Sequence, residues 1–355
     1  MAVLVTGGAG YIGSQICVDL LALNKEVVIV DDLSNSSLEV VENIELISGK
    51  KVHFFQVDLK NRIELELVFR TFQFSEVIHL AGVKSVNDSI QNPLEYYSQN
   101  ILGTIILLDC MKKNNVEKII FSSSATVYGV PEKIPIAESA KTDPINPYGL
   151  TKLAIEQLLN ALANANKNLS IVILRYFNPI GAHESGLIGE KPLSKPNNLM
   201  PFITQVAMKE REYLNVFGDD YDTKDGTGVR DYIHIADLSS GHIMALNYLD
   251  DFKGCETFNL GSGTGFSVLE IINAFQRVNG IHLNYKVVEK RNGDVAVCIA
   301  DISKAAVYLK WRPNKTIEDM CKDSWNIQQM QSIALAKDEE KIIEKRKYEL
   351  WIPQS

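Results

Sequence analysis

Short apolar runs alternate with segments of helical spacing through the first half of this chain. The runs are AVLVTG, EVVIVDDL, KVHFFQVDL, EVIHLAG, KIIFSSSATVYG and SIVILRYFNPIG. Runs of this length and composition predict buried strands, and the amphipathic segments between them predict helices. Strands that alternate with helices form a parallel sheet with helices on both faces. The pattern therefore predicts an α/β fold with a doubly wound parallel sheet.

The pattern loosens after Gly181, where the chain reads HESGLIGEKPLSKPNN. Apolar elements resume directly afterwards, so we interpret this stretch as a substrate-side loop and not as a linker. We predict a first domain over residues 1–180, a smaller α/β substrate domain over residues 181–335 and a charged tail over residues 336–355. Part of residues 230–260 reads as a short strand and an amphipathic helix, and we expect it to return to the first domain.

Three glycines stand at intervals of three between the first predicted strand, residues 3–5, and the first predicted helix, residues 11–23. Gly7 suits a tight turn, Gly10 lets a pyrophosphate approach backbone N–H groups, and Gly13 lets the helix lie close to the strand. The N-terminus of the helix then faces the anion. This order of strand, glycine turn and helix predicts a Rossmann dinucleotide site.

Two carboxylates, Asp31 and Asp32, end the second predicted strand. They follow the glycines by about 20 residues, where a carboxylate accepts hydrogen bonds from the adenosine ribose and repels a 2′-phosphate. The sequence therefore favours NAD over NADP as the cofactor.

The charge balance and composition narrow the partners of the chain. With a net charge of -8, the chain has no electrostatic footprint for a nucleic acid, and a few local cations must hold any anionic ligand. Strand residues begin at position 2 and no apolar stretch approaches about 18 residues, which predicts a cytoplasmic protein without a membrane partner. The five cysteines form no Cys-x-x-Cys pair and the six histidines are scattered, so we expect no metal site.

Tyr148 and Lys152 stand four residues apart at the start of the helical run NPYGLTKLAIEQLL, so their side chains project from one face of a helix. A phenol with a pKa near 10 is a poor base at neutral pH, but an ammonium group and a cationic nicotinamide both favour the phenolate. Chance alone yields about one such pair in a chain of this composition. Residues 122–124 add serine hydroxyls at the carboxyl edge of the sheet, where doubly wound folds bind ligands.

Eight motifs follow one another along the chain: GGAGYIG, SSSATVYG, PYGLTK, LRYFNPIGAH, NNLMPFI, GTGVRDYIHI, NLGSG and RNGDVAVCIAD. In these motifs and their order the chain resembles the UDP-hexose 4-epimerases of the extended short-chain dehydrogenase/reductase family, over nearly its whole length to about Trp325. The resemblance implies an isomerase that holds NAD tightly, forms a homodimer and acts on UDP-hexoses. Such an enzyme oxidises C4 of the sugar, lets the 4-keto sugar turn over and reduces it on the other face.

The resemblance also implies roles for single residues. Tyr148 is the catalytic base, Lys152 binds the nicotinamide ribose and lowers the pKa of the tyrosine, and Ser124 hydrogen-bonds the sugar O4. The implied NAD contacts, besides Tyr148 and Lys152, are Gly7, Gly10, Tyr11, Ile12, Gly13, Asp31, Asp32, Leu33, Asn35, Ser36, Asp58, Leu59, Leu80, Ala81, Gly82, Lys84, Gln99, Ser122 and Phe177. The implied nucleotide-sugar contacts are Ser124, Asn178, Asn197, Asn198, Leu199, Asn215, Phe217, Arg230, Arg291, Asp294 and Cys298. Gln99 stands where many relatives have Asn, and Leu80 stands where some have Phe. These differences affect only the expected details of the cofactor pocket.

Cys298 stands where members restricted to UDP-glucose and UDP-galactose carry a bulky tyrosine. In this family a small residue leaves room for an N-acetyl group, so the resemblance implies activity on UDP-GlcNAc and UDP-GalNAc as well. Three alternatives stay open. The first is an epimerase limited to UDP-glucose and UDP-galactose, with Cys298 a small buried strand residue. The second is a nucleotide-sugar 4,6-dehydratase, which needs an Asp-Glu pair where this chain has Ala125 and Thr126. The third is a regulator that binds NAD without catalysis.

Overall fold

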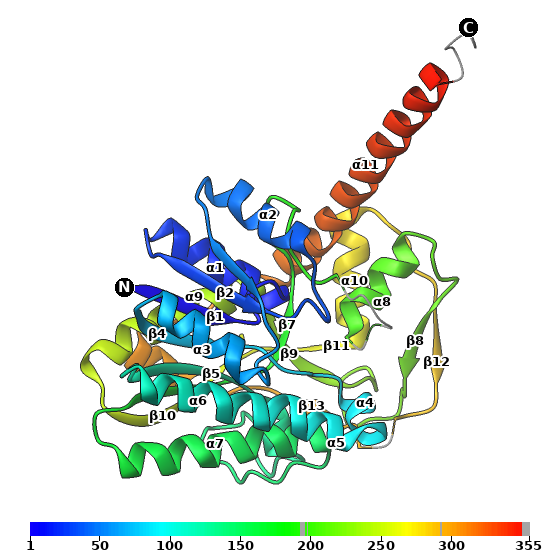
Figure 1. Ribbon diagram of the computed structural model, residues 1–355. Helices are drawn as coiled ribbons and strands as arrows, with labels where there is room; N and C mark the ends of the chain where they lie inside the picture. Colours follow the sequence, from blue (N-terminus) through cyan, green and yellow to red (C-terminus); the bar gives the residue numbers. More distant parts are fainter. Residues whose placement is uncertain (192–195, 197, 292, 350–355) are drawn as a thin grey trace, which may run out of the picture.

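A parallel sheet of seven strands forms the centre of the first part of the structure (Figure 1). The computed structural model describes residues 1–191, 196, 198–291 and 293–349. The strands are β1 (Ala2–Thr6), β2 (Val27–Asp31), β3 (His53–Gln56), β4 (Phe74–His79), β5 (Lys118–Ser124), β6 (Ser170–Tyr176) and β10 (Gly254–Leu260). Their order is β10-β6-β5-β4-β1-β2-β3, and all neighbours are parallel. The predicted doubly wound parallel sheet is confirmed.

Helices cover both faces of this sheet, because each presents an apolar face to it. The helices on one face are α1 (Tyr11–Ala22), α2 (Leu38–Ser48) and α9 (Ile235–Asp251). The helices on the other face are α3 (Arg62–Thr71), α6 (Gly103–Lys113) and α7 (Pro147–Ala165). Ile16 and Leu238 are buried in the first core, and Leu107 and Leu159 are buried in the second. The strands between them read as continuous apolar runs because both of their faces are covered.

The chain enters this sheet again late in the sequence. β10 pairs with β6 along its whole length, from Gly254 opposite Ser170 to Leu260 opposite Tyr176. Because all seven strands run in the same direction, their carboxyl ends meet at one edge. That edge carries the loops that follow β1, β2, β4 and β5, and it is where doubly wound sheets bind ligands.

The second part of the structure is a smaller α/β unit that begins directly after β6. Its strands β7 (Asn178–Ile180), β9 (Val229–His234), β11 (Gly265–Ser267) and β13 (Val297–Cys298) form one sheet, and β8 (Leu214–Phe217) pairs with β12 (Tyr285–Val288). Its helices are α8 (Leu199–Ala207), α10 (Val268–Asn279) and α11 (Ile317–Glu349). Ile203, Phe275 and Met320 are buried in their shared core. In Figure 1 the C-terminal end of α11 projects away from the body.

Short helical segments connect the larger elements. These are α4 (Val86–Gln91), α5 (Pro93–Tyr96), η1 (Tyr97–Leu102), η2 (Ala125–Tyr128) and η3 (Ala305–Leu309). The first three lead from β4 into α6, and η2 continues from the end of β5. Within the described residues, no helix has both the length and the apolar character that crossing a membrane requires.

Candidate active site

The glycine turn between β1 and α1 has room for backbone alone. Gly7 has a φ of +71°, and a Cβ at this position would lie 2.7 Å from the Ala81 backbone N. A Cβ on Gly13 would lie 2.2 Å from the Gly7 carbonyl oxygen, so α1 packs directly on the turn. Gly10 is the N-cap residue and places no side chain over the first turn of α1. The turn therefore leaves N–H groups at a helix N-terminus open to an anion such as a pyrophosphate.

Asp31 ends β2 beside this turn. Its Oδ2 accepts a hydrogen bond from Ala9 N at 3.1 Å, and its Oδ1 accepts from Leu33 N at 2.9 Å and from Ser36 Oγ at 2.8 Å. Burial raises the pKa of Asp31, and these hydrogen bonds oppose the rise. The carboxylate is thus held at the edge of the glycine turn, where a ribose contact requires it. Asp32 instead accepts hydrogen bonds within its own loop.

The loop after β4 carries four predicted NAD contacts, Leu80, Ala81, Gly82 and Lys84, and Asn100 of η1 holds it in place. Asn100 Oδ1 accepts a hydrogen bond from the backbone N of residue 83 at 2.9 Å, and Nδ2 donates to the carbonyl of the same residue at 3.1 Å. Asn100 could not be predicted from the sequence, because an asparagine inside a helical segment follows no motif or period.

Glu190 joins Lys84 and Asn198, and it too could not be predicted from the sequence. Glu190 Oε1 lies 3.2 Å from Lys84 Nζ and accepts a hydrogen bond from Asn198 Nδ2 at 2.7 Å. Lys84 belongs to the β4 loop and Asn198 precedes α8, so Glu190 links a predicted cofactor contact to a predicted sugar contact. It stands in a Gly- and Pro-rich stretch without a motif. Asn197, also predicted as a contact, lies outside the described residues.

The three predicted catalytic residues meet at the end of β5 and the first two turns of α7. Lys152 Nζ donates a hydrogen bond to the Ser122 carbonyl at 2.8 Å, which ties α7 to the strand end. The Ser124 side chain is near enough to Tyr148 to act on the pKa of the phenol, which it lowers. Ser124 Oγ also accepts a hydrogen bond from Thr126 N at 3.2 Å, at the start of η2. A phenol, an ammonium group and a hydroxyl therefore lie close together at the end of β5, and these are groups that can take part in a proton transfer.

Burial dominates the electrostatics of this group. It raises the pKa of Tyr148 to about 12, against the opposing effect of the Ser124 side chain. It lowers the pKa of Lys152 to about 8, against the effect of the Glu156 carboxylate. Lys152 Nζ lies 5.9 Å from the centre of the Tyr148 ring. The sequence predicts that Lys152 and a nicotinamide cation together favour the phenolate. In the protein alone burial favours the neutral phenol, so the phenolate would need the positive charge of the oxidised cofactor.

Four of the predicted nucleotide-sugar contacts gather on the second part of the structure. Arg291 Nε donates a hydrogen bond to Asp294 Oδ2 at 2.8 Å, and Arg230 Nη2 lies 3.8 Å from Asp294 Oδ1. The Arg291 guanidinium lies 4.8 Å from the centre of the Phe217 ring. These residues come from β8, β9 and the segment before β13. The two arginines are cations of the kind that can hold a diphosphate.

Cys298 connects this second part to the strand end of the first. It lies opposite Arg230 in the pairing of β13 with β9, and it packs against the same apolar cluster, around Phe177, as Ala125 does. Burial raises the pKa of the Cys298 thiol to about 11. This small side chain is therefore neutral at neutral pH. Two further predicted contacts, on β7 and β8, are exposed; they are Asn178 and Asn215.

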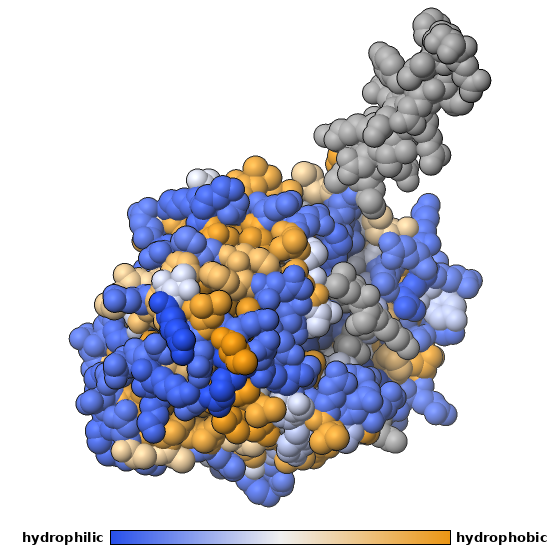
Figure 2. All heavy atoms as spheres, in the orientation of Figure 1, coloured by the Kyte–Doolittle hydropathy of each residue, from blue (hydrophilic) through white to orange (hydrophobic). Residues whose placement is uncertain are grey.

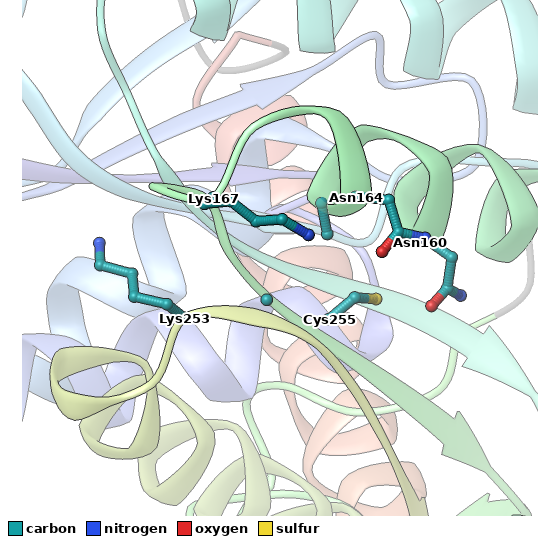
Figure 3. A pocket seen from close by; sticks show the side chains of 7 residues that line it. Asn160, Asn164, Lys167, Lys253 and Cys255 are labelled. Carbon is teal, nitrogen blue, oxygen red and sulfur yellow. The ribbon is translucent and has the colours of Figure 1, made fainter.

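A surface cavity of about 310 Å³ lies away from this group (Figure 3). Asn164 of α7 and Lys167 of the loop after it line one side, and Lys253, Gly254 and Cys255 line the other at the entry to β10. Because β5, β6 and β10 are parallel, the start of β10 is at the edge opposite to the serines that end β5. Figure 3 shows the Lys253 side chain directed away from the other labelled residues. The cavity is therefore not part of the candidate active site.

The sheet, the glycine turn and the Ser124, Tyr148 and Lys152 group define a Rossmann-fold enzyme of the short-chain dehydrogenase/reductase type. Residues 4–324 match the family model described as GDP-mannose 4,6 dehydratase. UDP-glucose 4-epimerase of Bacillus subtilis strain 168 is 51% identical over 328 residues, which cover 92% of this chain and 97% of the relative.

Two solved structures are also similar to this chain. One is the UDP-glucose-4-epimerase of Stenotrophomonas maltophila with bound NAD and formylated UDP-arabinopyranose, with a TM-score of 0.92 and 48% identity, covering 94% of this chain and 99% of that chain. The other is the UDP-glucose 4-epimerase of Bifidobacterium longum in complex with NAD+ and UDP, with a TM-score of 0.90 and 47% identity, covering 93% and 98%. This chain belongs to the UDP-glucose 4-epimerase family. The enzyme class that the resemblance implied, an isomerase of the UDP-hexose 4-epimerase type, is confirmed.

Proposed function

We propose that this chain interconverts UDP-glucose with UDP-galactose, and UDP-GlcNAc with UDP-GalNAc, by inverting the configuration at C4. NAD is the cofactor: when bound, it accepts a hydride from C4 and returns it to the other face of the sugar. The glycine turn and Asp31 offer the pyrophosphate and ribose sites that it needs. Lys152 offers an ammonium group to the nicotinamide ribose.

The observation that carries the proposal is the meeting of Ser124, Tyr148 and Lys152 at the carboxyl edge of the sheet. Tyr148 takes the proton of the sugar 4-hydroxyl while C4 is oxidised, and it returns a proton to O4 on reduction. Ser124 holds O4 by a hydrogen bond, and Lys152 fixes the end of β5 through the Ser122 carbonyl. The 4-keto sugar turns over between the two steps, while the diphosphate stays bound to Arg230 and Arg291.

The inclusion of N-acetylated sugars rests on Cys298. The thiol is small, neutral and packed beside the cluster that contains Phe177. Overpacking a rigid pocket costs roughly 1–3 kcal/mol. A small residue at this position therefore leaves room for a bulky C2 substituent, which can bind without the free-energy cost of overpacking.

The test is turnover by the purified protein without added oxidant or reductant. The protein is incubated separately with UDP-glucose and UDP-GlcNAc, and the products are separated by chromatography and weighed by mass spectrometry. We expect epimers of unchanged mass from both substrates and bound NAD in the protein. A product lighter by one water would indicate a dehydratase. The description of the matching family model makes this outcome worth testing, although Ala125 and Thr126 stand where a dehydratase needs an Asp-Glu pair. Bound NAD without turnover would indicate a regulator.

The proposal includes a homodimer. Five apolar residues on the consecutive segments α4, α5, η1 and α6 expose between 41% and 83% of their surface; they are Ile90, Leu94, Tyr97, Leu102 and Ile105. Figure 2 shows apolar side chains on the face where Figure 1 places α6 and α7. Exposed apolar surface of this kind marks protein contacts, and a second copy meets it with the same face in a two-fold dimer.

Sedimentation equilibrium tests the dimer. We expect Leu94→Asp to shift the protein to monomer, because a charge then has to be buried at the contact. Ile63→Asp on α3 is the control, since Ile63 is 82% exposed and Leu94 is 83% exposed. A monomeric wild-type protein contradicts this part of the proposal.

A further inference from the structure

Glu156 is a buried carboxylate beside the site, and the proposed reaction gives it no role. Glu156 follows Lys152 by one turn of α7 and is 3% exposed. Its Oε1 accepts hydrogen bonds from Ser123 Oγ at 2.5 Å and from Arg175 Nε at 3.0 Å. Its Oε2 accepts a hydrogen bond from Arg175 Nη2 at 2.6 Å. Because a buried ion pair adds little net stability over apolar packing, its effect must be sought in what the pair holds in place.

The partners of Glu156 lie on the strands that form the floor of the site. Ser123 stands in β5 between Ser122, whose carbonyl accepts a hydrogen bond from Lys152, and Ser124, whose side chain lowers the pKa of Tyr148. Arg175 of β6 is directly opposite Ser123 in the pairing of the two strands. One carboxylate on α7 therefore links the helix to β5 and β6 at the level of the reacting groups.

We propose that Glu156 is a positioning residue, whose carboxylate holds the end of β5 against α7 so that Ser124, Tyr148 and Lys152 keep their relative places. The inference rests on the proposed function, because these three residues are the ones that the proposed epimerisation uses. Without the carboxylate, the Lys152 bond to the Ser122 carbonyl is left to hold the strand end to the helix.

Glu156 also sets the charge around Lys152. Burial lowers the pKa of Lys152 to about 8, and the Glu156 carboxylate opposes this. His79 of β4 is bound by the Thr6 and Thr104 hydroxyls, and burial together with the charge of Lys152 lowers the pKa of His79 to about 3. Burial also raises the pKa of Tyr176 on β6, which lies near Tyr148. His79, Tyr176 and Tyr148 are neutral at neutral pH. The Glu156 carboxylate is the group that favours the ammonium form of Lys152.

Glu156→Gln tests the inference, because glutamine keeps the size of the side chain and removes its charge. Arg175 is then a buried cation without its carboxylate. We expect Lys152 to lose its proton at a pH lower by about one unit, and the alkaline limb of kcat to move down by a similar amount. We also expect kcat at neutral pH to fall by about tenfold or more.

Glu76→Gln is the matched control. Glu76 is also a buried glutamate with a cationic partner, since it is 6% exposed and its Oε1 lies 3.5 Å from Lys25 Nζ. It lies in β4 close to the amino end of the strand, away from the site. We expect this control to leave the titration of Lys152 and the pH profile unchanged.

Two further variants separate charge from position. Glu156→Asp keeps the charge and shortens the reach, so it should restore the titration of Lys152 but not kcat. Ser123→Ala removes one hydroxyl and leaves the ion pair of Glu156 with Arg175, so it should lower kcat severalfold without moving the pH profile. It also decides the matter if Glu156→Gln does not fold.

The titration is read without turnover. The holoprotein is labelled with ¹³C at lysine Cε, and the resonance of Lys152 is identified by its absence from Lys152→Ala. An unchanged Lys152 titration in Glu156→Gln, or kcat values in Ser123→Ala and Glu156→Gln equal to those of Glu76→Gln, overturns the inference. Failure of the wild-type protein to epimerise UDP-glucose overturns the proposed function, and the titration still decides the role of Glu156.

Discussion

The two sides of the candidate site differ in how deeply their functional groups are buried and in how firmly other protein groups hold them. On the catalytic side, Tyr148 and Lys152 are buried, and Lys152 is bound to the Ser122 carbonyl. On the nucleotide-sugar side, Arg230 is partly exposed and Arg291 is exposed. These two cations share one carboxylate, that of Asp294.

This difference separates chemistry from binding. Groups that move a proton must be held before the substrate arrives, because their alignment decides the rate. Groups that hold a diphosphate need only be close and available, since exposed ion pairs exchange partners at little cost. Substitutions on the catalytic side should therefore change kcat, and substitutions on the other side should change KM or the choice of substrate.

The largest effect is expected from Tyr148→Phe. It removes the proton acceptor and almost no contact area, so kcat should fall by about 10²- to 10⁴-fold. Bound NAD, measured after denaturation of the protein, should stay at the wild-type level. Near-normal turnover would show that another group takes the proton.

Lys152→Ala should come next, with a loss of about 10²-fold at neutral pH, because a nearby ammonium group shifts the pKa of a phenol by one to three units. The phenolate of Tyr148 is populated again as the pH rises, so the rate should recover partly in a pH profile of kcat. Lys152→Met, which keeps the length of the side chain without its charge, should behave in the same way. A flat profile in both variants contradicts the electrostatic role.

Cys298→Tyr should change the choice of substrate more than the rate. The ring should exclude the N-acetyl group and lower kcat/KM for UDP-GlcNAc by about tenfold to a hundredfold. Activity on UDP-glucose should be retained, and Cys298→Ser should keep both activities. Equal losses on both substrates would mean that Cys298 does not border the sugar C2 position.

Arg291→Ala should have the smallest effect. Arg291 is about half exposed, so KM for UDP-glucose should rise by roughly tenfold, the lower end for a hydrogen bond to a charged group. Kinetics at saturating substrate should show kcat close to that of the wild type. Arg211→Ala is the control, because the Arg211 guanidinium also lies beside an aromatic ring, 5.0 Å from the centre of Phe202, and Arg211 is not a predicted contact. A fall in kcat without a change in KM would place Arg291 with the catalytic groups.

The parts of the site that could be predicted from sequence are those with a local signal. The glycine turn follows a strand and opens a helix, so Gly7, Gly10 and Gly13 could be placed from spacing alone. Tyr148 and Lys152 lie on one face of their helix whatever the rest of the fold is, because four residues make about one turn. Asn100, Glu156 and Glu190 have no such signal, since each acts through partners far away in the sequence.

The sequence by itself determined the sheet, the dinucleotide turn and the Tyr148–Lys152 pair, because strand, turn and helix periods are properties of neighbouring residues. Only the tertiary structure decided that Asp294 pairs with Arg230 of β9, and that burial raises the pKa of Tyr148 to about 12. Burial and ion pairing depend on segments that meet across the whole chain, and no local pattern records which segments those are.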